Sequence, residues 1–216
     1  PITSWVLVDA SASAAQHDRA RPDWSRLDHA CATAACLVEL ALQQGDRFGV
    51  IAVNGEGVHL VPAGSGPRQR DRVHLLLRQL RARGGWPSMD MLRPVWERVQ
   101  PGDLLVALGD GFDAAGTVLL ERLAAARREV LQVQLLSADE RDFPFTDGHR
   151  FRDPETGEEL LGDGRAIRAD YLVRFAQAQR ELQARLHASG IVHAVGYLDQ
   201  PLDAPLRQLF GAGGGA

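Results

Sequence analysis

The stretch Ile2-Thr3-Ser4-Trp5-Val6-Leu7-Val8-Asp9-Ala10-Ser11-Ala12-Ser13 decides the fold of this chain. Its first part, up to Val8, is short and mostly apolar, which predicts a buried strand. The strand runs directly into a polar cluster that holds the Asp9 carboxylate and the hydroxyls of Ser11 and Ser13. This pattern is typical of an α/β protein, in which ligands bind beyond the carboxyl ends of the strands.

Strand-like and helix-like segments alternate along the rest of the chain. Apolar runs predict further strands at residues 48–53, 58–61, 104–108, 130–136 and 191–198. Helical spacing of small and apolar residues predicts helices at 28–44, around 73–80, and at 88–100, 116–128, 165–189 and 202–210. The strands at 48–53 and 58–61 are separated by a short segment that contains Gly55 and Gly57, which favours an antiparallel hairpin. We therefore expect a three-layer, Rossmann-like α/β fold, with a mostly parallel central sheet, one antiparallel edge strand and helices on both faces.

The length of 216 residues favours one domain, which we place at residues 1–210. A polar insertion at about 137–163 interrupts the alternation of strands and helices. Within it, Phe151-Arg152-Asp153 and Glu159-Leu160-Leu161 flank Pro154-Glu155-Thr156-Gly157 like the two arms of a hairpin. Residues 211–216 are rich in glycine and are expected to form a disordered tail.

The composition excludes several classes of function. The net charge of -4 gives no reason to expect nucleic acid as a partner. All 24 basic residues are arginine, so a phosphate-loop lysine and a Schiff base are impossible. The two cysteines, Cys31 and Cys36, are spaced unfavourably for a disulfide on the predicted helix, which fits a reducing compartment. No apolar run approaches the roughly 20 residues of a membrane span, so we expect a cytoplasmic location. Pro1 is no translational start, and an anchor outside this chain stays open.

A second acidic residue, Asp110, follows the predicted strand at 104–108 in the way that Asp9 follows the first strand. If the sheet winds in opposite directions from these two strands, their carboxylates converge on one crevice. Alternate residues of an extended loop point the same way, so Asp9, Ser11 and Ser13 can face one point. Carboxylate, hydroxyl and water oxygens suit Mg²⁺, with Mn²⁺ or Ca²⁺ as alternatives. The other interpretation is a polar loop in which Ser11 or Ser13 caps a helix and no ion binds.

Several further segments are similar to one known family. They are Gln44-Gly45-Asp46, Gly84-Gly85, Pro101-Gly102-Asp103-Leu104, Asp142-Phe143-Pro144-Phe145, Phe151-Arg152-Asp153-Pro154-Glu155-Thr156-Gly157-Glu158, Tyr171-Leu172 and Pro201-Leu202-Asp203-Ala204-Pro205-Leu206-Arg207. The Asp-Phe-Pro-Phe and Pro-Glu-Thr-Gly segments are the most specific, because the generic fold does not require them. The chain resembles the von Willebrand factor A-like domains of the bacterial family called domain of unknown function 58, or DUF58.

This resemblance implies a metal-ion-dependent adhesion site. Its first loop would be Asp9, Ser11 and Ser13, and its third loop would supply Asp110. The second loop departs from the family pattern Gly-Gly-Thr-Asp-Leu, because this chain reads Gly84-Gly85-Trp86-Pro87-Ser88-Met89-Asp90. Ser88 could supply the missing hydroxyl only if the loop absorbs two extra residues.

The resemblance also implies a partner and a role. Proteins of this kind resemble those encoded beside MoxR-type AAA+ ATPases, and they are thought to act with them in chaperone-like assembly. We therefore expect a protein-protein interaction module that docks an acidic group of its partner through the ion. Two alternatives stay open, a scaffold with a degenerate site that binds partners without metal, and an unrecognised hydrolase.

A catalytic role is disfavoured by the residues around the loop. A haloacid dehalogenase would need a second acid where Ser11 stands, and a lysine further along the chain. The sequence also contains no G-x-S-x-G elbow of the serine hydrolases. We therefore expect a binding protein and not an enzyme.

Overall fold

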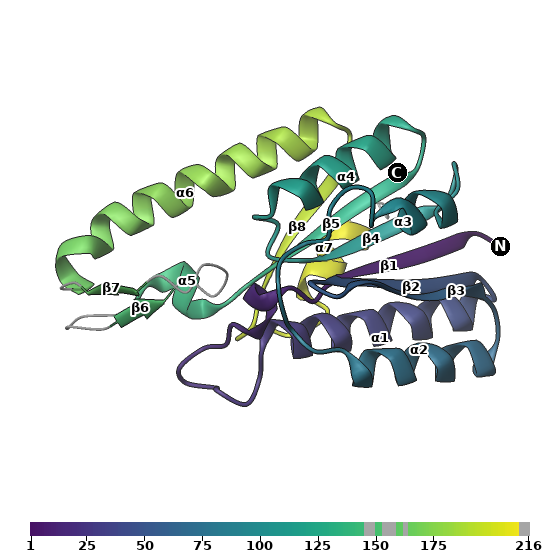
Figure 1. Ribbon diagram of the computed structural model, residues 1–216, viewed down its shortest axis with the longest axis horizontal. Coiled ribbons are helices and arrows are strands. Elements are labelled where there is room, and N and C mark those ends of the chain that lie inside the picture. The colour runs from purple at the N-terminus through teal and green to yellow at the C-terminus, as the bar shows by residue number, and fades with distance from the viewer. Residues whose placement is uncertain (145–149, 153–158, 162–163, 212–216) are drawn as a thin grey trace.

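Six strands form the central sheet of the structure, a computed structural model that describes residues 1–144, 150–152, 159–161 and 164–211 (Figure 1). They are β1 (Thr3–Asp9), β2 (Arg47–Asn54), β3 (Gly57–Gly64), β4 (Leu104–Gly109), β5 (Glu129–Leu136) and β8 (Val192–Tyr197). Their order across the sheet is β3-β2-β1-β4-β5-β8. β3 runs antiparallel to β2, and the other neighbouring pairs are parallel. The predicted sheet, mostly parallel with one antiparallel edge strand, is confirmed.

Helices cover both faces of this sheet, which confirms the predicted three-layer arrangement (Figure 1). They are α1 (Arg26–Gln44), α2 (Pro67–Gln79), α3 (Arg93–Arg98), α4 (Ala114–Ala125), α6 (Gly164–Ala188) and α7 (Ala204–Gly211). α1, α2 and α7 share a hydrophobic cluster with Val6 and Val8 of β1, whereas α3, α4 and α6 share a second cluster with Trp5 and Leu7 on the opposite face. This division follows from the alternation of side chains along a strand. Among the described residues, no helix is long and apolar enough to cross a membrane.

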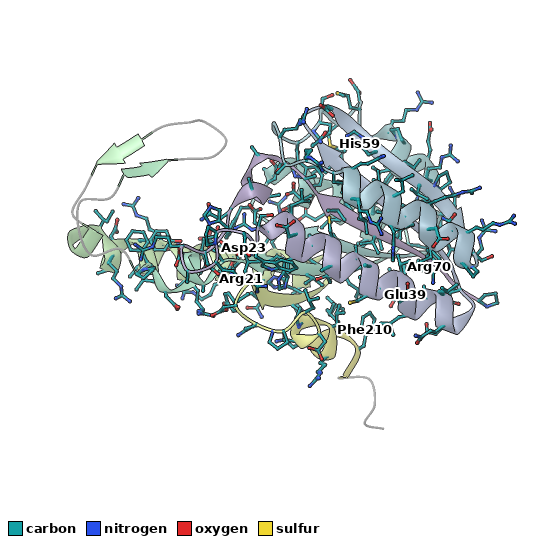
Figure 2. All side chains as sticks on the ribbon, turned by 90° about the horizontal axis from the view of Figure 1, so that it is seen from below. Arg21, Asp23, Glu39, His59, Arg70 and Phe210 are labelled. Carbon is teal, nitrogen blue, oxygen red and sulfur yellow. The ribbon has the colours of Figure 1, made fainter. Side chains whose placement is uncertain are left out.

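α1 shows how the sequence sets the limits of a helix. Ser25 Oγ accepts the Asp28 N–H at 3.1 Å and the Asp28 carboxylate accepts the Ser25 N–H at 2.9 Å, which together form a capping box. Gly45 ends the helix in the left-handed conformation, with φ at 73°, which glycine adopts without steric cost. α2 lies beside α1, and Figure 2 shows Glu39 and Arg70 on the two helices, with Arg70 Nε 3.8 Å from Glu39 Oε1.

Several predicted boundaries are wrong, and two of them lie at prolines. The strand predicted at 58–61 is longer, because β3 continues through Pro62 to Gly64. Proline is tolerated there because β3 is an edge strand. The helix predicted at 88–100 is the shorter α3, with Pro94 in its first turn. In a longer helix the Pro94 ring would clash with the carbonyl four residues earlier, so the helix begins only at Arg93.

The segment predicted as an insertion begins with a short helix, α5 (Ala138–Asp142), that the sequence pattern did not indicate. β6 (Arg150–Arg152) and β7 (Glu159–Leu161) follow and pair antiparallel, as a hairpin requires. The predicted turn at 154–157 lies outside the described residues, as does the predicted tail beyond Gly211. In Figure 1, α5, the two short strands and the first turns of α6 project together from the edge at which β1 ends.

Candidate functional site

β1 and β4 are neighbours in the middle of the sheet, and the chain winds away from them in opposite directions. From β1 it passes to β2 and β3 on one side, and from β4 it passes to β5 and β8 on the other. Asp9 ends β1 and Asp110 directly follows β4, in a register that places Val8 beside Leu108. The structure thus brings both carboxylates to the point where strand order reverses, which is the usual ligand crevice of such sheets.

Local hydrogen bonds align the polar groups of the first loop. Asp9 Oδ1 accepts the backbone N–H of Ser11 at 2.9 Å, and the hydroxyl oxygens of Ser11 and Ser13 lie 3.1 Å apart. Two ligands at adjacent corners of a Mg²⁺ octahedron, with bonds of about 2.1 Å, would be about 3.0 Å apart, so the two hydroxyls fit such an edge. The hydroxyls matter, because no group of three or more His, Cys, Asp or Glu side chains that could hold an ion occurs among the described residues.

The third loop is fixed by its own hydrogen bonds. Asp110 Oδ1 accepts the N–H of Phe112 at 2.9 Å, and the Asp110 carbonyl accepts Gln134 Nε2 at 2.8 Å. Gly109, which precedes Asp110, lets the Asp9 side chain lie close to the backbone of β4, since a Cβ at Gly109 would lie only 2.7 Å from Asp9 Cβ. A larger residue at position 109 would push the first carboxylate away from the second.

The crevice is buried and negatively charged. Asp9, Ser11, Ser13 and Asp110 are between 0% and 9% exposed. Burial raises the pKa of Asp9 above its ordinary value, hydrogen bonding to Ser11 acts in the opposite direction, and the charge of Asp110 raises the pKa further. Carboxylates whose charged form is poorly stabilised by the surrounding protein are typical of functional sites.

Replacing Asp9 with asparagine should therefore stabilise the metal-free protein at pH 7. The folded-state pKa of Asp9 lies above its ordinary value of 3.8, so the wild type loses stability as the pH rises from that value through the folded-state pKa. Asparagine removes this loss, and its side-chain oxygen can still accept the Ser11 N–H. Melting temperatures measured in chelator from pH 4 to pH 7 should show an advantage of the variant that grows with pH.

The matched control for this prediction is Asp23→Asn, which changes an exposed carboxylate in the loop before α1 (Figure 2). Its melting temperature should follow that of the wild type across the same pH range. If Asp9→Asn instead lowers the melting temperature at pH 7, the Asp9 charge is stabilised in the fold, contrary to this account.

The second loop lies beside the first, but its candidate hydroxyl does not face the crevice. The N–H of Ala12 donates to the Gly84 carbonyl at 2.7 Å, and the N–H of Arg83 donates to the Ala10 carbonyl at 3.0 Å. Ser88 is exposed, and its described hydrogen bond is made by its backbone carbonyl. No described contact joins Ser88 to the other four candidate residues, so the structure brings together the candidate residues of the first and third loops but not Ser88.

Trp86 is the residue of the second loop that lies beside Asp9. Its indole packs over Gly116, where an added Cβ would lie 2.9 Å from Trp86 Cζ2, and with Asp9 it lines a cavity of about 30 Å³. The indole N–H is buried without a hydrogen-bond partner among the described residues, although it is close enough to Asp9 to lower the pKa of that carboxyl. Because an indole N–H donates and has no lone pair to offer, Trp86 supplies no metal ligand.

Two charged residues at the crevice were not predicted as site residues. The side chain of Arg26, in the first turn of α1, is 3% exposed, and its Nη1 lies 3.4 Å from Asp110 Oδ2. Arg26 Nη2 also donates to both carboxylate oxygens of Glu140 in α5. A cation in the first turn of a helix is disfavoured by the helix dipole, so Arg26 required another partner. Glu140 completes a capping-box pattern with Ser137, and these two signals could have marked both residues.

Solved structures of low sequence identity share this fold. The VWA domain of SpRpn10 has a TM-score of 0.53 and 12% identity, over 96% of this chain and 94% of that domain. The conserved hypothetical protein BatB from Bacteroides thetaiotaomicron has a TM-score of 0.50 and 12% identity, over 88% of this chain and 99% of that one. These likenesses show the fold alone, and the fold is that of a von Willebrand factor A domain.

The sequence itself has relatives along most of its length. The uncharacterized protein Rv1480 of Mycobacterium tuberculosis is 29% identical over 195 residues, which are 85% of this chain and 58% of the relative. The chain therefore spans little more than half the length of that protein. The model of the family described as protein of unknown function DUF58 matches residues 1–182. Since that match covers most of the chain, the protein belongs to the DUF58 family.

Proposed function

We propose that this chain is a protein-interaction domain that binds a divalent cation between Asp9, Ser11, Ser13 and Asp110. Mg²⁺ is the favoured ion, with Mn²⁺ or Ca²⁺ as alternatives. The observation that carries the proposal is the pair of hydroxyls 3.1 Å apart beside two buried carboxylates at the reversal of strand order. Hard oxygen atoms of this kind are the ligands that Mg²⁺ prefers.

The role of the protein is to hold these oxygens in place in a crevice that is largely closed to bulk solvent. Ser11 N–H and Phe112 N–H each occupy one oxygen of a carboxylate, which orients the second oxygen of Asp9 and of Asp110. When bound, the ion would supply an open coordination position to an acidic side chain of a partner. Three side chains of one short loop act together, so the change of a single hydroxyl should weaken the whole set.

The partner we propose is a MoxR-type AAA+ ATPase, on the strength of the family resemblance. Support for a protein partner also comes from the third loop. Phe112 is 44% exposed, and it contacts Phe175 of α6 edge-on with ring centroids 6.4 Å apart. Exposed aromatic side chains beside a binding site favour protein interfaces.

A second candidate function is binding of partners without metal. Trp86 presents a donor where the family pattern has a hydroxyl, and Arg26 already supplies a positive charge to Asp110. A site of this kind would rely on shape and exposed side chains alone. Catalysis has less support, because no described histidine hydrogen-bonds to Ser11 or Ser13, and a serine nucleophile needs such a base.

Cation titration tests the proposal directly. Mg²⁺ and Mn²⁺ should each give binding heat with the wild type and raise its melting temperature. Saturation at about 100 times the dissociation constant adds about 2.7 kcal/mol of stability. Asp9→Ala and Ser13→Ala should lose the heat and the rise, whereas Asp23→Ala should keep both. If neither ion binds the wild type while the purified ATPase is still retained in the presence of chelator, the metal-free candidate replaces this one.

A further inference from the structure

The Arg26 guanidinium lies inside the proposed cation site. Its Nη1 donates to the Ser13 carbonyl at 2.7 Å and lies 3.4 Å from Asp110 Oδ2. Both of these residues belong to the loops that would hold the ion. Since the Arg26 side chain is only 3% exposed, this contact is shielded from solvent.

The contact with Asp110 is the weaker of two that Arg26 makes with carboxylates. Arg26 Nη2 reaches Glu140 Oε2 at 2.6 Å in a two-pronged pair, whereas the separation from Asp110 Oδ2 is 3.4 Å. The Nε atom of Arg26 is buried and has no described hydrogen-bond partner. The guanidinium is therefore held closely by Glu140 and by the Ser13 carbonyl, and its contact with Asp110 is the long one.

Charge balance explains why a cation is placed there at all. Asp9 and Asp110 are both buried in the crevice, and two buried carboxylates without a counter-charge are costly. The first turn of a helix repels a cation, so Arg26 gains its stability from the surrounding acids and not from α1. A divalent ion between the same carboxylates would satisfy the same charge and would repel the guanidinium.

We infer that Arg26 is the resident cation of the crevice and that a divalent ion binds by displacing it from Asp110. This inference rests on the proposed function and names how that site is regulated. On displacement, Arg26 keeps its pair with Glu140, which serves as the alternative anion. The carbonyl of Glu140 accepts the Tyr171 hydroxyl of α6 at 2.9 Å, so this alternative anion is anchored by a second helix.

Changes of Arg26 and of Glu140 should have opposite effects on the affinity for the cation. Arg26→Gln removes the competing charge, and at a few ångströms this should tighten Mn²⁺ binding at least about tenfold. Glu140→Gln removes the alternative anion and leaves Arg26 on Asp110, so it should weaken Mn²⁺ binding at least about threefold. Glutamine at position 140 keeps the capping box of α5, which protects the fold in this variant.

The double variant separates competition from a general effect of charge. If Glu140 acts through Arg26, Glu140→Gln has no further effect on affinity once Arg26 is glutamine. If the two charges act independently, their effects on the Mn²⁺ dissociation constant multiply. Arg185→Gln is the matched control, because it breaks an exposed two-pronged pair with Glu121 and should leave affinity unchanged.

The measurement is calorimetric titration of the full chain with Mn²⁺, with melting temperature as a second readout. Tighter binding by Arg26→Gln, weaker binding by Glu140→Gln and a double variant that matches Arg26→Gln support the inference. Wild-type affinity in Arg26→Gln overturns it and leaves the proposed function intact. If Arg26→Gln binds Mn²⁺ and the wild type does not, Arg26 is the resident cation but the proposed function of the wild type is overturned. If no folded variant binds Mn²⁺, both the inference and the proposed function are overturned. If Arg26→Gln does not fold, unchanged affinity in Glu140→Gln overturns the inference.

Discussion

Replacing Arg26 with leucine should lower the free energy of unfolding of the metal-free protein by about 3–5 kcal/mol, the usual cost of removing one partner from a buried ion pair. The side chains of Glu140 and Asp110 that remain are only 23% and 11% exposed, so water can compensate them only in part. Burial lowers the pKa of Arg26, but the charges of Glu140 and Asp110 raise it by more, which keeps the guanidinium protonated. Urea unfolding followed by circular dichroism gives the loss directly.

The control for this prediction is Arg185→Leu. Arg185 pairs with Glu121 at a similar distance, 2.6 Å, but its side chain is 47% exposed. Exposed pairs contribute at most about 1 kcal/mol, so this variant should unfold almost like the wild type. Equal and small losses in both variants would mean that solvent reaches the Arg26 pair, and the charge balance of the crevice would need another source.

The second large effect is expected at Trp5, in the strand that carries Asp9. Trp5→Ala should cost about 3–5 kcal/mol, because the indole is 2% exposed in the core between the sheet and the α3, α4 and α6 layer. Gly49, opposite Trp5 in β2, is its steric complement, since a Cβ there would lie 2.5 Å from Trp5 Cζ3. The side chain therefore fills space that no neighbour can reoccupy without moving the backbone.

Two further variants complete the test, one that divides the contribution of Trp5 into parts and one that changes a more exposed tryptophan for comparison. Trp5→Phe keeps most of the volume and loses the hydrogen bond from Nε1 to Asp103 Oδ2, at 3.0 Å, so about 1 kcal/mol should be lost. Trp96→Ala removes a tryptophan that is 38% exposed and stacked on Arg128, and should cost about 1 kcal/mol or less. Unfolding by guanidinium chloride, followed by circular dichroism, ranks the three. A loss for Trp5→Ala no larger than that for Trp96→Ala would contradict this packing.

The parts of the fold that could be predicted are those that depend on local patterns in the sequence. The alternation of apolar runs and helical faces predicted the sheet, and it placed Asp9 and Asp110 at the ends of two strands. Their convergence followed from one topological rule, the reversal of strand order. Ser11 and Ser13 could be added because they share a loop with Asp9.

The rest of the site depends on contacts between residues that are far apart in the chain. Arg26 meets Asp110 across 84 positions and Glu140 across 114, so a local signal can mark one of these residues but cannot identify its partner. Trp86 was passed over because an aromatic residue was not a candidate ligand. The predicted extent of α3 was wrong for a local reason, because Pro94 prevents the helix from beginning earlier despite the helical spacing of the residues around it.

Pro62 in β3 affects more than the boundary of a strand. An outer strand normally presents free N–H and C=O groups on which another chain can pair, and this is a common route to aggregation. Pro62 has no N–H, and its carbonyl accepts a hydrogen bond from Gln69 Nε2 of α2 at 2.6 Å. This residue therefore has no free backbone group with which a second protein molecule could pair. At Pro62 the β3 edge therefore offers a second molecule no backbone group to pair with, which disfavours sheet-to-sheet association through this part of the strand.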